Sequence, residues 1–260
     1  ELLSFCVDLL TFCCICCSLT SFKESIHFWH IEVHHVAGSE HTAESVWVDG
    51  HDVTAEVHIV GGVHPERDIY YYADMIRRIK EIMPSICVKA FTAVELHYMI
   101  TKAGLTIEEG LQLLKEAGME SIPGGGAEIF DEKIRAELCP GKCSSVEWLE
   151  MHEEAHKLGF DSNATMLYGH VESIDHRIDH LMRLRDLQDR TGGLNAFIPL
   201  KFRSANNGME SLGETSIVDD MRTLALSRLI LDNVPHIKAY WVMYGKATAE
   251  MALSFGADDI

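Results

Sequence analysis

From residue 57 onward, short apolar runs alternate with longer amphipathic segments. The runs have the length of buried strands and occupy residues 57–60, 86–91, 119–122, 162–168, 196–202 and 237–243. Between them, apolar positions recur with helical spacing at 69–82, 94–103, 107–117, 129–138, 146–158, 175–188, 218–233 and 247–255. Alternation of this kind predicts a parallel sheet with right-handed crossovers, so we expect an α/β fold built as a partial TIM-type (β/α) barrel.

Local signals support these helix boundaries. Glycine follows the last periodic position of four helices, at Gly104, Gly118, Gly159 and Gly192. Two other positions have the spacing of a capping box, Thr106 with Glu109 and Ser144 with Glu147.

Residues 1–56 do not follow this pattern. They contain six histidines and two tryptophans and show no helix of convincing period. We therefore expect two parts: an atypical N-terminal segment at 1–56 and a barrel core at 57–260. A shift in reading frame is one hypothesis for the first part.

Three glycine-containing stretches follow predicted strands. The sequence SIPGGGAE at 121–128 places three consecutive glycines and Glu128 where a strand gives way to a helix. GGVHP at 61–65 and NATMLYGH at 163–170 likewise lie at strand ends. Ligands of (β/α) barrels bind at this rim, and consecutive glycines suit close approach of the main chain, although a plain turn would explain each stretch alone. Their recurrence at successive strand ends predicts a site.

Composition narrows the function. The formal charge of −18 argues against a nucleic-acid surface, which needs a basic face. Residues 1–19 are apolar, but they include Glu1 and Asp8 and lack a basic leader, so we expect neither a targeting signal nor a membrane span. Five of the eight cysteines crowd into residues 6–17, which indicates metal or redox chemistry in a reducing, cytoplasmic compartment rather than a disulfide scaffold.

Two further motifs have ordinary explanations. HEEAH at 152–156 fits the H-E-x-x-H pattern of zinc peptidases, but it lies within a helix of the kind that packs outside a barrel. A zinc hydrolase is therefore a distant alternative. Cys139 and Cys143 flank Pro-Gly-Lys and are read as incidental thiols in a turn, since two ligands make an incomplete site.

Several of these stretches together carry a resemblance. From residue 56 to residue 260 the chain resembles the aminofutalosine (aminodeoxyfutalosine) synthases, radical S-adenosylmethionine (radical SAM) enzymes of the futalosine route to menaquinone. The matching segments are EVHIVGGVHP (56–65), VKAFTAVE (88–95), SIPGGGAEIF (121–130), NATMLYGHVE (163–172), TGGLNAFIPL (191–200), LDNVPHIKAYWVM (231–243) and LSFGADDI (253–260). Related families are the dehypoxanthine futalosine synthases and the deazaflavin-forming synthases; the segments KAFTAVE, KAYWVM and LSFGADDI favour the aminofutalosine synthases.

The resemblance implies a chemistry. A 4Fe–4S cluster on three cysteines spaced C-x-x-x-C-x-x-C would bind S-adenosylmethionine and cleave it. The 5′-deoxyadenosyl radical would add to the enolpyruvyl double bond of 3-[(1-carboxyvinyl)oxy]benzoate, and loss of carbon dioxide would give aminofutalosine. The implied partners are this small-molecule substrate and an electron donor such as flavodoxin or ferredoxin, with no nucleic acid and no membrane.

The same resemblance implies roles for particular residues. Gly61 and Gly62 would meet the methionine end of the cofactor, and Glu128 would reach its ribose or amino group. Candidates for the substrate side are His64, Arg135, Thr165, Tyr168 and His170. A guanidinium binds a carboxylate through two hydrogen bonds, which makes Arg135 the natural partner for a substrate carboxylate.

The cluster loop departs from the family pattern. In the best register Cys6 and Cys13 agree with the motif, but Leu10 stands where the middle cysteine belongs, and leucine cannot ligate iron. Other registers also give two of three, so the candidate ligands are Cys6, Cys13, Cys14 and Cys17. Three explanations stay open: a rearranged loop, a corrupted N-terminal sequence, or a cluster-free and catalytically silent barrel. We also expect a C-terminal segment beyond Ile260.

Overall fold

The sheet of this protein is mostly parallel. The computed structural model describes residues 30–35, 47–48, 51–52, 54–205 and 209–260. Its seven-stranded sheet has the order β1-β4-β5-β6-β7-β8-β9, and strands β4 to β9 are parallel. The strand bounds are β1 His30–His35, β4 Thr54–Val60, β5 Cys87–Ala90, β6 Ser121–Ile122, β7 Asp161–Tyr168, β8 Leu194–Lys201 and β9 His236–Ile237. A separate pair is formed by β2 Trp47–Val48 and β3 His51–Asp52.

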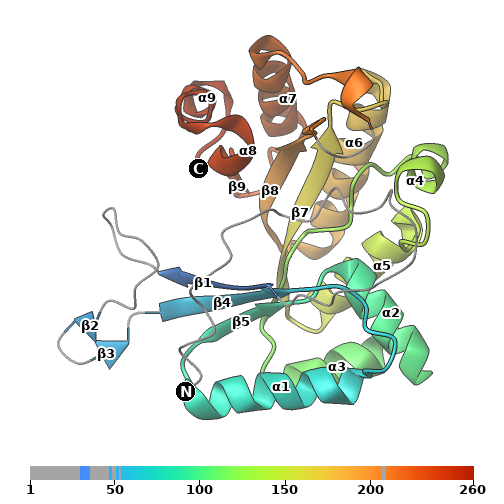
Figure 1. The fold of residues 1–260 in the computed structure, drawn as a ribbon, viewed down its shortest axis with the longest axis vertical. Coiled ribbons are helices and arrows are strands. Elements are labelled where there is room, and N and C mark those ends of the chain that lie inside the picture. Colours follow the sequence, from blue (N-terminus) through green and yellow to red (C-terminus); the bar gives the residue numbers. More distant parts are fainter. Residues whose placement is uncertain (1–29, 36–46, 49–50, 53, 206–208) are drawn as a thin grey trace.

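Helices connect the parallel strands. Their bounds are α1 Ile69–Ile82, α2 Ala93–Ala103, α3 Ile107–Ala117, α4 Glu132–Leu138, α5 Ser145–Lys157, α6 Ile174–Thr191, α7 Ile217–Ile230, α8 Trp241–Tyr244 and α9 Lys246–Ala252, with short 3₁₀ turns η2 Glu210–Leu212 and η3 Leu253–Phe255. Figure 1 shows α1 to α3 beside β4 and β5, and α7 to α9 beside β8 and β9. The predicted α/β architecture with a parallel sheet is confirmed.

The predicted helix ends are confirmed where local chemistry sets them. Thr106 with Glu109 and Ser144 with Glu147 form complete capping boxes at α3 and α5. Gly104, Gly118 and Gly192 end α2, α3 and α6 in the left-handed conformation, which glycine adopts without a Cβ penalty. These signals act within one turn of helix, and so the sequence predicts them well.

Two of the boundaries that differ from the prediction have a cause in the structure. Helix α4 begins at Glu132 rather than at residue 129, because the Asp131 side chain accepts hydrogen bonds from the amides of Lys133 and Ile134 and caps the helix there. Strand β9 ends at Ile237 rather than at residue 243. The chain then turns, with the Ala239 amide donating to the Asp259 carbonyl, and residues 241–244 form α8.

One face of the sheet packs against the helices, and this decides where each strand side chain points. Val57 and Ile59 of β4 are buried, while Glu56, His58 and Val60, which alternate with them, are partly exposed. Strand side chains alternate between faces, so the buried set faces the helical layer. In β7 the same rule places Ser162, Ala164, Met166 and Tyr168 on one face.

The N-terminal part departs from parallel order. β1 pairs with β4 in the antiparallel sense, with Val33 opposite Val57. The regular strand–helix pattern begins at Thr54, three residues before the predicted boundary. The division into a segment at 1–56 and a core at 57–260 stays a prediction, because much of the first part lies outside the described residues.

Candidate functional site

The glycine-containing stretches meet at one edge of the sheet. β4, β6 and β7 are parallel members of the same sheet, so their carboxyl ends lie at the same edge. Gly61 and Gly62 follow β4, residues 123–128 follow β6, and Gly169 and His170 follow β7. The predicted convergence of these loops is therefore present. We call this side the carboxyl edge.

The three consecutive glycines are required by close packing against the protein itself. A Cβ on Gly124 would lie 2.6 Å from the Cα atom of Ala164 and from the carbonyl of Asn163 in β7. On Gly126, where φ is +81°, a Cβ would meet the Val94 side chain at 2.5 Å. The expectation that the main chain lies close to something is met by β7 and the first turn of α2.

Backbone strain also concentrates at the carboxyl edge. Among the described residues, two that are not glycine have positive φ: Phe91 at 61° directly after β5, and Glu128 at 47° after the glycines. Left-handed backbone costs on the order of 1–2 kcal/mol for residues with a side chain. Strain of this kind often clusters at functional sites, and the site predicted here stays a prediction.

A carboxylate that the sequence analysis did not single out holds the first glycine loop. Glu95 of α2 is buried and accepts hydrogen bonds from the Gly61 amide at 2.9 Å and from the amide and hydroxyl of Thr92, both at 2.8 Å. Burial raises the pKa of Glu95, while the bonds from Thr92 and Gly61 lower it in part. The T-x-x-E spacing of Thr92 and Glu95 is a capping-box signal that could have identified it.

Glu128 is the charged residue of the second glycine loop, residues 123–128. Its residue is 7% exposed, and its Oε1 atom lies 2.6 Å from the Lys142 ammonium. Its backbone carbonyl accepts from the Leu167 amide of β7 at 2.7 Å. The proposed cofactor ligand is thus a buried carboxylate whose described partner is one lysine.

The guanidinium of Arg135 donates hydrogen bonds to main-chain carbonyls. It is buried and donates to the carbonyls of Ala127 and Cys143, each at 2.5 Å, with longer bonds to Ile129 and Gly126. The prediction that Arg135 binds a substrate carboxylate stays untested. Its contacts favour a different role, which is to hold the Glu128 loop.

Thr165 is likewise bonded within the protein. Its hydroxyl donates to the Gly124 carbonyl at 2.6 Å, and its own carbonyl lies 2.9 Å from Nε2 of His180. His180 is fully buried and stacks on Phe130 with ring centroids 3.8 Å apart. Burial lowers the pKa of His180 to about 3, so the ring is neutral. Thr165 therefore connects the glycine loop to the helical layer.

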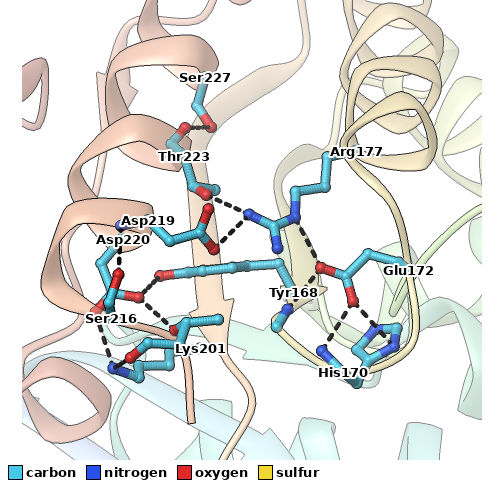
Figure 2. A network of polar contacts seen from close by, with 12 residues as sticks. Tyr168, His170, Glu172, Arg177, Lys201, Ser216, Asp219, Asp220, Thr223 and Ser227 are labelled. Atoms are coloured by element: carbon cyan, nitrogen blue, oxygen red, sulfur yellow. Dashed lines mark hydrogen bonds and ion pairs between the residues drawn. The ribbon is translucent and has the colours of Figure 1, made fainter.

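Tyr168 points into the helical layer rather than toward the open face of the sheet. Its hydroxyl lies 2.8 Å from Oδ1 of Asp220 (Figure 2). The same hydroxyl lies 3.1 Å from the hydroxyl of Tyr244. Asp220 also binds the Lys201 ammonium at 2.8 Å and the Thr215 hydroxyl at 2.7 Å. Tyr168 is fully buried. Its predicted substrate contact is untested, and these bonds favour a packing role.

His170 belongs to a second buried network beside the first. Its Nδ1 accepts from the Val171 amide at 2.8 Å, which leaves the proton on Nε2 for the Leu167 carbonyl at 3.0 Å. Glu172 accepts from the His170 amide and pairs with Arg177 at 2.7 Å (Figure 2). Burial lowers the pKa of His170. Both ring nitrogens are used, so a substrate contact would need rearrangement.

His64 lies on the loop that follows Gly61 and Gly62. The Lys102 ammonium of α2 bonds the carbonyls of His64 at 3.2 Å, Pro65 at 2.5 Å and Arg67 at 2.9 Å, which fixes this loop. The His64 ring accepts from the Glu66 amide through Nδ1 at 3.0 Å. His64 is partly exposed, whereas the side chain of His170 is fully buried and the other three candidates are buried residues. His64 is therefore the most accessible to a ligand among the predicted substrate-side residues.

The proposed cluster ligands are four cysteines near the N-terminus. Cys6, Cys13, Cys14 and Cys17 lie outside the described residues. Burial raises the pKa of Cys143 to about 11 and also raises the pKa of Cys139, so both thiols are protonated, as expected for incidental thiols. In the part of the chain that the structure describes, no group of three His, Cys, Asp or Glu is arranged to hold a metal ion.

The H-E-x-x-H histidines lie at the opposite edge of the sheet. Ser162, near the start of β7, has its hydroxyl 2.9 Å from Nδ1 of His152 and 2.7 Å from Nε2 of His156. The other His156 nitrogen meets the Thr191 hydroxyl, and Glu153 pairs with Arg190 and Lys157. Burial lowers the pKa of His156 to about 4. These side chains connect α5 to the sheet.

Comparison with known families assigns the fold to a superfamily. The model described as "Radical SAM superfamily" matches residues 14–184, about two thirds of the chain. The chain belongs to the radical SAM superfamily. Members of this superfamily use a 4Fe–4S cluster and S-adenosylmethionine. A second model, "CofH/MqnC C-terminal region", matches residues 191–260.

Curated relatives place this radical SAM protein more narrowly. It is 47% identical over 209 residues to an aminodeoxyfutalosine synthase of Thermus thermophilus, covering 79% of this chain and 56% of the relative. It is 41% identical over 223 residues to an aminodeoxyfutalosine synthase of Streptomyces coelicolor, covering 82% and 57%. The chain thus spans little more than half the length of the relatives it matches.

Other similar proteins differ in name. A 5-amino-6-(D-ribitylamino)uracil–L-tyrosine 4-hydroxyphenyl transferase of Methanothermobacter thermautotrophicus is 41% identical over 211 residues, covering 79% of this chain and 57% of the relative. Among solved structures, methylornithine synthase (PylB) superposes with a TM-score of 0.55 at 15% identity, covering 74% of this chain and 51% of that one. This likeness supports the partial barrel. None of the helices in the described ranges is long and apolar enough to cross a membrane.

The carboxyl edge of this radical SAM chain fits a cationic ligand. Glu128 supplies a buried carboxylate, and a Cβ on Gly62 would meet nothing within 4 Å, so there is open space beside the first glycine loop. S-adenosylmethionine carries a sulfonium and an ammonium, which suit a carboxylate. The amide hydrogen of Gly61 is already accepted by Glu95, and the predicted contact of Gly61 with the cofactor stays a prediction.

Proposed function

We propose that this chain is the core of a radical SAM synthase that forms aminofutalosine in menaquinone biosynthesis. The observation that carries the proposal is the convergence of the Gly61–Gly62 loop and the Glu128 loop at one carboxyl edge. The 47% identity to an aminodeoxyfutalosine synthase supports the specific reaction. The substrate in this proposal is 3-[(1-carboxyvinyl)oxy]benzoate.

The residues of this chain would bind and shelter the reactants. When bound, S-adenosylmethionine supplies a carbon-centred radical that adds to the enol ether of the substrate. The Gly61–Gly62 loop would lie against the methionine end of the cofactor, and Glu128 would hold its ribose or ammonium. His64 is the best-placed candidate for the substrate. The sheet and its helices would exclude water from this edge, which limits side reactions of a radical.

The residues that would bind the cluster are part of the same proposal. They would come from Cys6, Cys13, Cys14 and Cys17, with Leu10 at the middle motif position in one register. The superfamily match begins at residue 14 and therefore includes Cys14 and Cys17. Thiolates suit iron–sulfur clusters, and no other described cysteines are grouped to replace them.

The wider setting follows from this reaction. We propose a cytoplasmic enzyme that receives electrons from a flavodoxin or ferredoxin and acts on a small molecule, without nucleic acid or membrane. The two-part organisation, with a segment at 1–56 and a core at 57–260, belongs to the same proposal.

The second candidate function is transfer of a 4-hydroxyphenyl group, as in the relatives named for that activity. Its support is the 41% identity to the Methanothermobacter protein, which equals that of the Streptomyces synthase. A dehypoxanthine futalosine cyclase and a catalytically silent, cluster-free barrel are the remaining alternatives.

Anaerobic reconstitution with iron and sulfide separates these possibilities. The proposed synthase should develop a reducible iron–sulfur absorption, form 5′-deoxyadenosine, and convert 3-[(1-carboxyvinyl)oxy]benzoate to a product with the mass of aminofutalosine. Product formation only from 5-amino-6-(D-ribitylamino)uracil and tyrosine would favour the transferase. A protein that develops no cluster absorption and forms no 5′-deoxyadenosine would be the silent barrel.

A further inference from the structure

Lys142 forms the described ion pair of the Glu128 carboxylate. The lysine lies in the turn after α4, and its Nζ atom is 2.6 Å from Oε1 of Glu128. The Glu128 side chain is 9% exposed and the Lys142 side chain 25%. A buried carboxylate needs a cation or several hydrogen-bond donors, so this contact largely neutralises Glu128.

Arg135 fixes the positions of the two loops that carry Glu128 and Lys142. Its guanidinium bonds the carbonyls on both sides of Glu128, those of Ala127 and Ile129, and also the carbonyl of Cys143 next to Lys142. One side chain therefore sets the position of both loops. The pair is consequently held in place from both sides, unlike a surface ion pair between two free side chains.

The surroundings of Lys142 are acidic and lie beside the first glycine loop. The charge of Glu95, whose carboxylate bonds the Gly61 amide, interacts with that of Lys142. Burial by itself lowers the pKa of Lys142, and the charge and hydrogen bond of Glu128 reverse this, so the pKa is raised. The ammonium is thus present at neutral pH, between two buried carboxylates.

We propose that Lys142 competes with the cationic end of the cofactor for Glu128, and so sets the affinity of this edge for a sulfonium or ammonium ligand. The inference rests on the proposed function, because it takes Glu128 as a contact of S-adenosylmethionine. When the cofactor binds, its cation replaces the Lys142 ammonium at Glu128. Lys142 then moves toward solvent, which its partial exposure and flexible side chain permit.

This exchange conserves charge at the buried carboxylate. Glu128 keeps one cation throughout, so binding does not create an unpaired buried charge. The cofactor must nevertheless break an existing pair, which lowers its apparent affinity. Uncharged ligands that place only a ribose near Glu128 gain nothing from breaking this pair. Lys142 would therefore lower the affinity of this edge for a cationic ligand and leave the affinity for an uncharged ligand unchanged.

Equilibrium binding to Lys142→Met tests the proposal. Methionine keeps the length of the side chain and removes its charge. Binding of S-adenosylmethionine to the anaerobically reconstituted full chain is measured by calorimetry for the wild type and for K142M. We expect K142M to bind S-adenosylmethionine about tenfold more tightly, a factor within the range of about 5–150 that coupled binding equilibria usually show. Binding of 5′-deoxy-5′-methylthioadenosine, which has the ribose but no charge, should not gain.

Two variants make the comparison specific. Lys133→Met removes an exposed lysine of α4 and should leave both affinities unchanged. In a Glu128→Gln background, the Lys142→Met change should no longer tighten binding, because the competition needs the carboxylate. Loss of this coupling in the double-mutant cycle is the signature of one shared partner.

Other results would overturn the inference. An unchanged or weaker affinity of K142M for S-adenosylmethionine would show that Lys142 does not compete. An absence of binding to both proteins would refute the proposed function, and the inference with it. An equal gain for methylthioadenosine would assign Glu128 to the ribose instead. Cluster absorption and 5′-deoxyadenosine report on the proposed function separately. A wild type that forms 5′-deoxyadenosine beside an unchanged K142M would refute only the role of Lys142.

Discussion

The two edges of the sheet use buried polar side chains in opposite ways. At the carboxyl edge several of the buried groups are charged and paired, as in Lys142 with Glu128 and Lys201 with Asp220. Near the amino edge, His152 and His156 are neutral and share the hydroxyl of Ser162. Both sets are rich in residues that catalyse reactions elsewhere. This difference teaches that a sequence motif indicates a functional site only where glycine loops, strained backbone and buried charges occur beside it.

The charged networks at the carboxyl edge also connect the two parts that the family models match. Tyr168 belongs to the stretch matched by the radical SAM model, whereas Lys201, Asp220 and Tyr244 belong to the stretch matched by the C-terminal model. Figure 2 shows Tyr168 of β7 reaching the helix that carries Asp220. The Arg177 guanidinium lies 4.9 Å from the centre of the Tyr168 ring. Polar bonds therefore hold the second part onto the first.

Removing Asp220 should have the largest effect. The change Asp220→Ala leaves Lys201 buried without its partner and removes a bond from Tyr168, so we expect a loss of about 3–5 kcal/mol in the free energy of unfolding. Urea unfolding at neutral pH measures it. Asp179→Ala, at an exposed site with a 3.8 Å pair, is the control and should cost little. Equal losses for the two variants would contradict a special role for the carboxyl-edge charges.

Lowering the pH should reduce the free energy of unfolding mainly through the neutral histidines near the amino edge. The pKa of His156 is about 4 in the folded chain, below the ordinary value of 6.5, so the unfolded chain takes up protons first as the pH falls. Stability from His156 is therefore complete above pH 6.5 and is lost between pH 6.5 and 4. His152 and His180, whose pKa values are also lowered, act in the same direction.

A histidine substitution isolates this contribution. In His156→Asn, the loss of unfolding free energy between pH 7.5 and 4.5 should shrink by about 1–2 kcal/mol. Urea unfolding at both pH values gives the difference. His236→Asn removes an exposed histidine and should leave the acid-induced loss as it is. If both variants lose stability in acid as the wild type does, the buried histidines do not set the acid sensitivity.

The smallest effect is expected at Glu153, the acid of the H-E-x-x-H pattern. Its ion pairs with Arg190 and Lys157 are partly exposed, so Glu153→Gln should change the unfolding free energy by only about 0.5–1 kcal/mol. Added zinc should not raise the Tm of either protein in a thermal scan. A zinc-dependent rise in the wild type that E153Q abolishes would make this side of the sheet a metal site after all.

Part of the carboxyl edge could be predicted from residues close together in sequence. The strand that precedes Gly61 and the glycines that precede Glu128 are local patterns, and parallel order then places the two loops at one edge. Glu95 could have been found from its capping-box spacing with Thr92, but nothing local shows that its carboxylate also reaches the Gly61 amide, 34 residues away. No sequence pattern indicated a role for Lys142 beyond its position in a predicted turn.

The partners of the predicted substrate residues needed the folded chain. Arg135 has the side chain that binds carboxylates, yet it bonds carbonyls that no pattern could assign to it. Side chains alternate between the two faces of a strand, so Ser162 and Tyr168 lie on the same face of β7. The sequence did not show which face packs against the helices, and so it could not place Tyr168 in the helical layer.

The amino-acid sequence by itself determined the helices, their caps, the order of strands and helices, and the resemblance to radical SAM enzymes, because periodicity and capping act over a few residues. Only the tertiary structure decided which polar groups are already paired. Tyr168 meets Asp220 across 52 residues of sequence, and Glu128 meets Lys142 because Arg135 draws both of their loops together. Such pairings depend on where the chain returns in space, which local chemistry does not encode.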